Sequence, residues 1–358
     1  MSFTTKSQAL LSQLAGDPTT EALFTDLAER QAILRFEAAL AVVQARLGII
    51  PEDAAAAIAD VCGRFEADPR DLATAMARDG VTVPGLIRQL REALGEPHAK
   101  HLHFGTTSQD AIDTALALRL ADFLKLLDGR LNSVLASLHS LADRFGDRTL
   151  MGRTRMQAAL PIRVGDRINI WTAPVEDRLA ALNALSPSLL RLQLAGPVGT
   201  SETLGPKATD LRAALALELE LTDPGRSWQT DRTALTDFGN WLSSVCGVLG
   251  KIGQDVALMA QMGREEIALS GGGGSSAMPH KSNPVRAETL VALARYTATL
   301  LPGLHAALIH EQERSGSAWT LEWLILPDMC VATAAATRHA QALLDAVESL
   351  GQDGEPGR

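Results

Sequence analysis

The sequence predicts an all-α protein with two helical parts, a small N-terminal domain and a long central bundle. Its 358 residues are 46% hydrophobic but only 4% aromatic, with many Ala and Leu residues. Such a composition favours helices over sheets. Apolar residues also recur at helical spacing over stretches much longer than a usual helix. Many of these stretches are apolar on every face, which predicts burial against other subunits.

The N-terminal domain is expected over residues 1–100. Its helices follow recognisable start signals, such as Asp68-Pro69 and Pro51-Glu52, because proline is well tolerated in the first turn of a helix. The four expected helices span residues 20–46, 51–62, 69–79 and 85–94.

The central bundle is expected over residues 101–350. Long helices with apolar stripes, joined by short connections, are typical of antiparallel bundles. The five expected helices span residues 111–145, 163–194, 233–267, 285–314 and 321–350. The polar segment 351–358 is predicted to be a disordered tail.

Charge and cysteine content narrow the classes of function. The formal net charge is −9, which disfavours partners such as nucleic acid or an anionic membrane. The three cysteines are far apart and lack metal-ligand spacing, so we expect buried reduced thiols in a cytoplasmic protein and no metal. No apolar run is long enough to form a signal core or to cross a membrane.

One stretch, Leu269–Glu288, combines a glycine run with a dense set of polar groups. Gly271–Gly274 form a run with little steric restriction, and two serines, Lys281 and Asn283 follow. This pattern predicts a mobile loop that closes over a small polar ligand. The alternative is a surface linker, but a linker has no need of so many hydrogen-bond donors between long apolar helices.

Three other polar segments interrupt the apolar helices, at residues 101–110, 152–157 and 311–319. All lie at ends or breaks of long helices. One end of a single bundle cannot easily bring all of them together with the glycine loop. We therefore expect neighbouring chains of an oligomer to combine them.

These segments resemble the shared regions of the fumarase/aspartase superfamily. Gly274–Pro284 reads GSSAMPHKSNP and is similar to its signature, while HFGTTSQD and GRTRMQ resemble its two other shared regions in the correct order. The resemblance implies an all-α fold whose central bundles associate into a homotetramer, with each active site drawn from three chains. It also implies that a C-terminal helical domain found in many members is largely absent.

Within the superfamily, three motifs resemble the 3-carboxy-cis,cis-muconate cycloisomerase branch. They are TSQD at 107–110, KIGQD at 251–255 and AWTLEWLILP at 318–327. Adenylosuccinate lyase, which releases fumarate, is the competing branch. This chain has VPGLIR at 83–88, Arg155 after Thr154, and Trp323 after Glu322, where that branch carries other residues. A catalytically silent helical scaffold is a further alternative, although the glycine loop argues against it.

The resemblance implies lactonisation of a small tricarboxylate in protocatechuate breakdown, without a cofactor. One carboxylate attacks an alkene carbon, and fixed donors must stabilise the doubly charged aci-carboxylate that develops. Catalytic roles are expected for Ser275, Lys281 and Glu288. Substrate-binding roles are expected for His103, Thr107, Ser108, Gln109, Thr154, Arg155, Gln157, Asn283 and Arg314.

Several of these assignments have an alternative. Arg155 replaces a histidine of the superfamily and cannot act as an acid at neutral pH, so it is expected to clamp a carboxylate and to pair with Glu288. His103 contacts substrate or is a structural hydrogen-bonded residue. Arg314 and Arg232 contact anionic substrate groups or are cations at helix ends.

Overall fold

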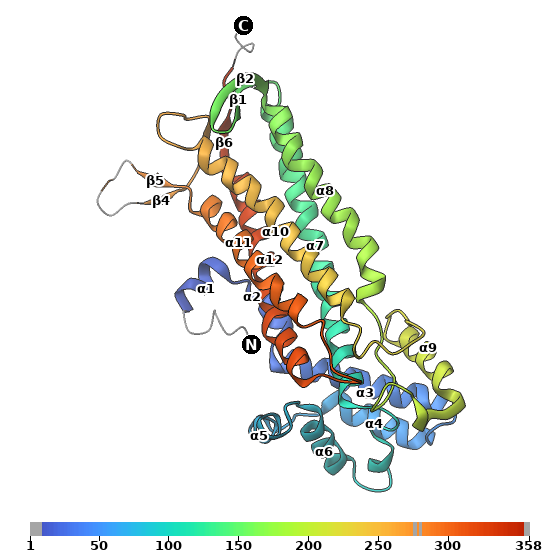
Figure 1. The fold of residues 1–358 in the computed structure, drawn as a ribbon. Helices are drawn as coiled ribbons and strands as arrows, with labels where there is room; N and C mark the ends of the chain where they lie inside the picture. Colours follow the sequence, from blue (N-terminus) through green and yellow to red (C-terminus); the bar gives the residue numbers. More distant parts are fainter. Residues whose placement is uncertain (1–8, 275–277, 279–280, 354–358) are drawn as a thin grey trace.

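The computed structural model describes residues 9–274, 278 and 281–353. Figure 1 shows an elongated molecule in which long helices run side by side along the main axis. The helices α3–α6 and α9 gather at one end of this bundle, and the strands β1, β2 and β6 lie at the other end. The prediction of an all-α fold is confirmed, since the strands are short and pair only two at a time.

The N-terminal helices begin and end close to the predicted positions. One difference is that the expected helix 20–46 is divided in two. Thr25 is the N-cap of the second part, and its hydroxyl accepts a hydrogen bond from Ala28 N at 3.2 Å, which favours a fresh helix start. The elements are α1 (Ala9–Ala15), α2 (Pro18–Leu23), α3 (Asp26–Arg46), α4 (Glu52–Arg64), α5 (Pro69–Asp79) and α6 (Val83–Leu94).

Five long helices form the bundle. They are α7 (Ser108–Phe145), α8 (Val164–Leu189), α10 (Thr233–Met259), α11 (Val285–Ala306) and α12 (Gly316–Asp345), with α9 (Ala208–Glu218) packed near the N-terminal helices. Their apolar faces build one continuous core, in which Phe123 lies edge-on between the rings of Phe24 and Phe238. A second core joins the N-terminal helices to the first turns of α7 and to α9.

Four predicted helix ends are wrong. The helix expected to reach residue 194 ends at Leu189, and the one expected to reach 267 ends at Met259. The helix expected to reach 314 ends at Ala306, and the one expected to reach 350 ends at Asp345. Two of the lost segments form an antiparallel pair instead, with β3 (Ile267–Leu269) against β6 (Val347–Leu350). Helical periodicity does not reveal this pairing, because the two strands are far apart in the sequence.

The predicted disordered tail is partly wrong. Gly351 N donates to Glu266 O at 2.9 Å, and Gln352 exchanges two backbone hydrogen bonds with Thr149. Residues 351–353 therefore continue the fold, while 354–358 lie outside the described residues. The remaining strands are the hairpin β1 (Thr149–Thr154) and β2 (Gln157–Arg163), and the short pair β4 (Gly273–Gly274) and β5 (Ser282–Asn283).

The length of α7 separates the functional segments within one chain. Its 38 residues span about 57 Å at 1.5 Å per residue. Thr107 precedes its first residue, and the β1–β2 hairpin follows its last turn (Figure 1). The two segments therefore lie at opposite ends of the bundle in a single chain.

Candidate active site

The start of α7 is held in place by a buried carboxylate. Thr107 is the N-cap and forms a capping box with Asp110, which satisfies backbone donors in the first turn. Asp110 is fully buried and also accepts hydrogen bonds from Ala195 N at 3.0 Å and Gly196 N at 2.9 Å. Burial raises the pKa of Asp110, and these hydrogen bonds oppose that shift. The helix start and the 195–197 loop are thereby fixed to each other.

Arg314 joins two of the predicted substrate-binding residues at this helix start. Its Nε donates to Gln109 Oε1 at 2.9 Å, and its Nη2 donates to Thr107 Oγ1 at 3.0 Å and to Pro197 O at 3.3 Å. The exposed guanidinium precedes Ser315, the N-cap of α12. A cation is unfavourable at that positive end of a helix, so a role in satisfying a helix dipole does not describe Arg314.

We call Thr107, Ser108, Gln109 and Arg314 the α7 cluster. Ser108 is the half-buried first residue of α7. A guanidinium beside hydroxyls at a helix N-terminus is suited to binding a carboxylate, because donors converge there and the helix dipole favours negative charge. Four residues that were predicted separately from the sequence are thus brought together by the fold.

Gln109 is oriented by its own buried partners. Its Nε2 donates to Asp113 Oδ2 at 3.1 Å and to Gln229 O at 2.9 Å. With both amide hydrogens engaged, the oxygen Oε1 is turned towards Arg314. Asp113 therefore influences Arg314 through a single intervening side chain.

Asp113 belongs to a buried ion network that the sequence reasoning missed. Arg232 donates to Asp113 at 2.7 and 3.0 Å and to Glu322 at 2.8 and 2.7 Å. All three side chains are at most 2% exposed. Burial alone would raise the pKa of Glu322, but the charge and hydrogen bonds of Arg232, together with the neighbouring His310, outweigh burial, so the pKa lies below its ordinary value. The sequence does carry a signal for this network, because Asp113 and Glu322 each interrupt a strongly apolar helix stretch.

Arg232 is therefore not available to contact substrate, which was one of its two interpretations from the sequence. Its guanidinium also lies over the ring of Trp228 at 4.9 Å, and every side of it is occupied by protein groups. Burial lowers the pKa of Arg232, yet the two carboxylates outweigh burial and raise it overall. The residue is a permanent buried cation that joins α7, the start of α10 and α12.

His103 has a buried carboxylate partner on α3. Its Nδ1 lies 2.6 Å from Glu37 Oε1, and the Glu37 side chain is 0% exposed. Burial lowers the pKa of His103, but the charge and hydrogen bond of Glu37 outweigh burial, so the pKa lies above its ordinary value. This contact supports the structural alternative for His103, in the segment that precedes Thr107.

The second predicted segment forms the tip of the β1–β2 hairpin. Thr154, Arg155 and Gln157 are all exposed. Arg155 and Met156 form a two-residue turn with φ of 48° and 67°, the left-handed region that such turns require. Each non-glycine residue there costs roughly 1–2 kcal/mol. The hairpin presents Arg155 outwards, away from the α7 cluster of the same chain.

The glycine loop is built on close backbone contact. A Cβ atom on Gly272 would lie 1.6 Å from Ser282 Oγ, and one on Gly273 would lie 2.6 Å from Val285 Cγ2. These glycines are therefore required where β4 and β5 approach each other, in addition to any role in loop movement. Lys281 is exposed and Asn283 half-buried. Ser275, together with Ser276 and His280, lies outside the described residues.

Glu288 lies in the first turn of α11 and is exposed. In the part of the chain that the structure describes, neither Glu288 nor Arg155 forms an ion pair. Their predicted pairing stays a prediction. The helix α11 has 22 residues and separates Asn283 from the loop that carries Arg314 by about 33 Å. Within one chain the α7 cluster is therefore far from both the hairpin tip and the glycine loop, whereas Arg153 of the hairpin pairs with Glu266, shortly before the glycine run.

Comparison with known proteins identifies the family. A protein-family model described as lyase matches residues 12–296. The chain belongs to this lyase family, in the fumarase/aspartase superfamily. The matched region includes the α7 cluster's Thr107–Gln109, the hairpin and the glycine loop.

Named relatives refine this result. The chain is 40% identical over 333 residues to a 3-carboxy-cis,cis-muconate cycloisomerase from Pseudomonas aeruginosa, covering 91% of this chain and 72% of the relative. It is similar to the crystal structure of the 3-carboxy-cis,cis-muconate lactonizing enzyme from Pseudomonas putida, with a TM-score of 0.88, 37% identity, and coverage of 95% and 77%. Trans-aconitate decarboxylase 1 from Mycosarcoma maydis is 31% identical, with coverage of 94% and 69%.

Two other features are absent from the residues that the structure describes. No group of three or more His, Cys, Asp or Glu side chains in residues 9–274 and 281–353 is arranged to hold a metal ion. None of the helices in that same portion of the chain has an apolar stretch long enough to span a membrane.

Removal of Arg232 should be strongly destabilising. In Arg232→Met the carboxylates of Asp113 and Glu322 stay buried without a counter-charge, and we expect a loss of about 3–5 kcal/mol in the free energy of unfolding. Chemical denaturation followed by circular dichroism measures it. The control Arg64→Met breaks an exposed pair with Asp60 and should cost much less, because an exposed ion pair contributes little. Equal losses in the two variants would contradict a role for the buried network.

The His103–Glu37 contact should make stability depend on pH. Because the folded pKa of His103 is raised above 6.5, its contribution is complete at low pH and is lost as pH rises through the folded pKa. The difference in unfolding free energy between the wild type and Glu37→Gln should therefore shrink as the pH rises above the ordinary pKa of 6.5. The charge of Asp110 also raises the pKa of His103, and the charge of Arg91 lowers it. The exposed Glu92→Gln variant should show no such trend, and a difference that grows with pH would refute the assignment.

Proposed function

We propose that the protein is a 3-carboxy-cis,cis-muconate cycloisomerase that closes a lactone in protocatechuate breakdown in the cytoplasm. The observation that carries this proposal is the α7 cluster, in which Arg314 is held by Thr107 and Gln109 at an exposed helix start. The names of the relatives at 32–40% identity support the same reaction. A small tricarboxylate with a conjugated diene is the substrate.

The chemistry requires positive charge and donors where negative charge develops. The attacking carboxylate forms the new C–O bond, and electrons move into a neighbouring carboxylate as the aci form. Arg314, Thr107, Ser108 and Gln109 bind one carboxylate at the start of α7. Lys281 and Asn283 stabilise the aci-carboxylate, at roughly 3–4 kcal/mol for each well-placed donor.

A proton then moves to the carbon next to the aci-carboxylate, which completes the addition. Ser275 is assigned this transfer, with Lys281 holding its alkoxide form through charge. Arg155 and Thr154 clamp a further carboxylate, with Gln157 beside them. Glu288 pairs with Arg155 and orients it. His103 supports the loop before Thr107 through its contact with Glu37.

The proposal requires a homotetramer whose active sites are shared. Within one chain, α7 keeps the α7 cluster about 57 Å from the hairpin, and α11 keeps it about 33 Å from the glycine loop. A carboxylate substrate of this kind spans only a few bond lengths. Neighbouring chains must therefore supply the hairpin tip and the glycine loop to each α7 cluster.

Purified protein should consume the conjugated diene of 3-carboxy-cis,cis-muconate, measured as loss of its ultraviolet absorbance. Ser275→Ala should fold normally but lose about 10²–10⁴-fold in kcat, whereas its neighbour Ser276→Ala serves as the matched control. No loss of absorbance by a confirmed tetramer would overturn the proposal. Release of fumarate from adenylosuccinate, or turnover of trans-aconitate, would instead identify a different reaction of the same superfamily.

Sharing of sites between chains predicts complementation. Ser275→Ala and Arg314→Met should each be inactive alone, since each removes one group from every site. Coexpressed in equal amounts, they should recover about a quarter of wild-type activity, because random assembly places both native residues in one site out of four. Sequential purification through two different affinity tags, one on each variant, confirms mixed assembly. A mixed tetramer without recovered activity would show that Ser275 and Arg314 act from the same chain.

A further inference from the structure

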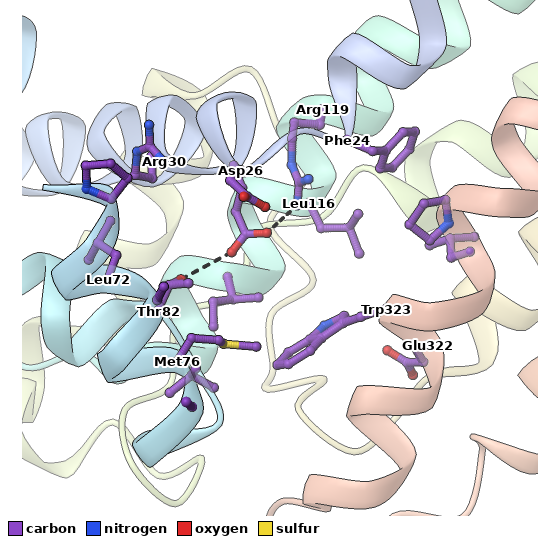
Figure 2. A pocket seen from close by; sticks show the side chains of 18 residues that line it. Phe24, Asp26, Arg30, Leu72, Met76, Thr82, Leu116, Arg119, Glu322 and Trp323 are labelled. Carbon is purple, nitrogen blue, oxygen red and sulfur yellow. Dashed lines mark hydrogen bonds and ion pairs between the residues drawn. The ribbon is translucent and has the colours of Figure 1, made fainter. Parts of the chain in front are cut away.

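A cavity of about 480 Å³ lies between the N-terminal helices and the bundle. Its walls come from α3, α5 and residues 81–82 on one side and from α7 and α12 on the other (Figure 2). The lining is largely apolar, with Leu72, Met76, Leu116 and Trp323 among its side chains. Its volume is within the range of pockets that enclose small organic ligands.

Arg119 gives this cavity a cation with little compensation. Its side chain is 11% exposed, and its Nε donates to Ala115 O at 3.2 Å. The carboxylate paired with it is that of Glu29, whose Oε2 lies 3.9 Å from Arg119 Nη2. This separation exceeds the 2.7–3.2 Å of a normal hydrogen bond. The terminal nitrogens of the guanidinium are therefore available for a closer anionic partner.

Glu29 is also drawn towards another group. Thr82 Oγ1, just before α6, donates to Glu29 Oε1 at 3.3 Å. Burial lowers the pKa of Arg119, and the charge of Glu29 only partly opposes this. A buried cation in an apolar wall is unfavourable until it acquires a well-bonded counter-ion.

The other charged side chains of the cavity do not serve as a well-bonded counter-ion for Arg119. Glu322 is fully engaged by Arg232 in the buried network. Asp26 and Arg30 both line the cavity with opposite charges. Arg119 is thus a nearly buried lining cation whose carboxylate partner lies beyond hydrogen-bond distance.

Trp323 supplies a broad apolar surface opposite this cation. Its ring packs against Trp319 with centroids 4.6 Å apart, which fixes its orientation, and Figure 2 shows it extending across the cavity below Arg119. Aromatic rings pack well on such a surface in offset or tilted arrangements. The cavity therefore combines one cationic end with one flat apolar wall.

We infer that this cavity binds a compact aromatic carboxylic acid, with the carboxylate on Arg119 and the ring against Trp323. The inference does not depend on the proposed function, because it uses neither Ser275 nor the α7 cluster. Binding is expected to change the fluorescence of Trp323 directly. The ligand also meets Glu322, which connects the cavity to Arg232 and Asp113.

The test uses the full-length protein and three probes of equal size but different charge, namely benzoate, benzyl alcohol and benzylamine. Calorimetry and tryptophan fluorescence should rank benzoate first and benzylamine last. Benzoate should bind at least about tenfold more tightly than benzyl alcohol, the advantage of a hydrogen bond to a charged group. The reverse order, or no saturable binding of benzoate, would overturn the inference.

Amino-acid substitutions test whether the three probes bind in this cavity. Arg119→Met should abolish the preference for benzoate while benzyl alcohol still binds. Ala77→Phe places a ring in the cavity and should block all three probes, whereas Thr74→Phe, on the same helix but outside the lining, should not. Loss of benzoate binding in Arg314→Met with retention in Arg119→Met and Ala77→Phe would assign it to the α7 cluster and refute a site at the cavity.

Discussion

The ion network of Arg232 with Asp113 and Glu322 is the constraint on which the rest of the structure depends. It joins residues of α7 and α12 to the start of α10, at the end of the bundle that meets the N-terminal helices. Such a network need not add net stability, since moving three charges out of water is costly. Its geometry is nevertheless demanding, because each carboxylate must lie within hydrogen-bond distance of one planar guanidinium. It therefore fixes the relative positions of three helices.

Both proposed sites are connected to this network. On one side, Asp113 holds Gln109, which in turn holds Arg314. On the other side, Glu322 lines the cavity, and Trp319 donates to Asp113 at 3.2 Å while packing on Trp323. The charge of Arg232 thus supports an anion-binding cluster at the surface and one wall of an apolar cavity through different side chains. Neither site can shift without changing contacts to the same buried cation.

The long helices impose a second constraint. They display the hairpin tip and the glycine loop far from the α7 cluster of the same chain. Their exposed positions, including the left-handed turn at Arg155, place these polar groups where other chains can meet them. The proposed reaction then depends on assembly as much as on folding. Burial against neighbouring chains also explains why the helices carry apolar residues on several faces.

The sequence by itself determined the fold class, the family and the identity of the polar segments, because helical periodicity and short motifs are local properties. It indicated Thr107, Gln109 and Arg314 separately, but only the tertiary structure decided that they meet, since 205 residues separate Gln109 from Arg314. The same holds for the β3–β6 pair, the ordered residues 351–353 and the Arg232 network. Each depends on groups distant in the chain, whose pairing follows from burial and hydrogen bonding in the folded core and from no local pattern.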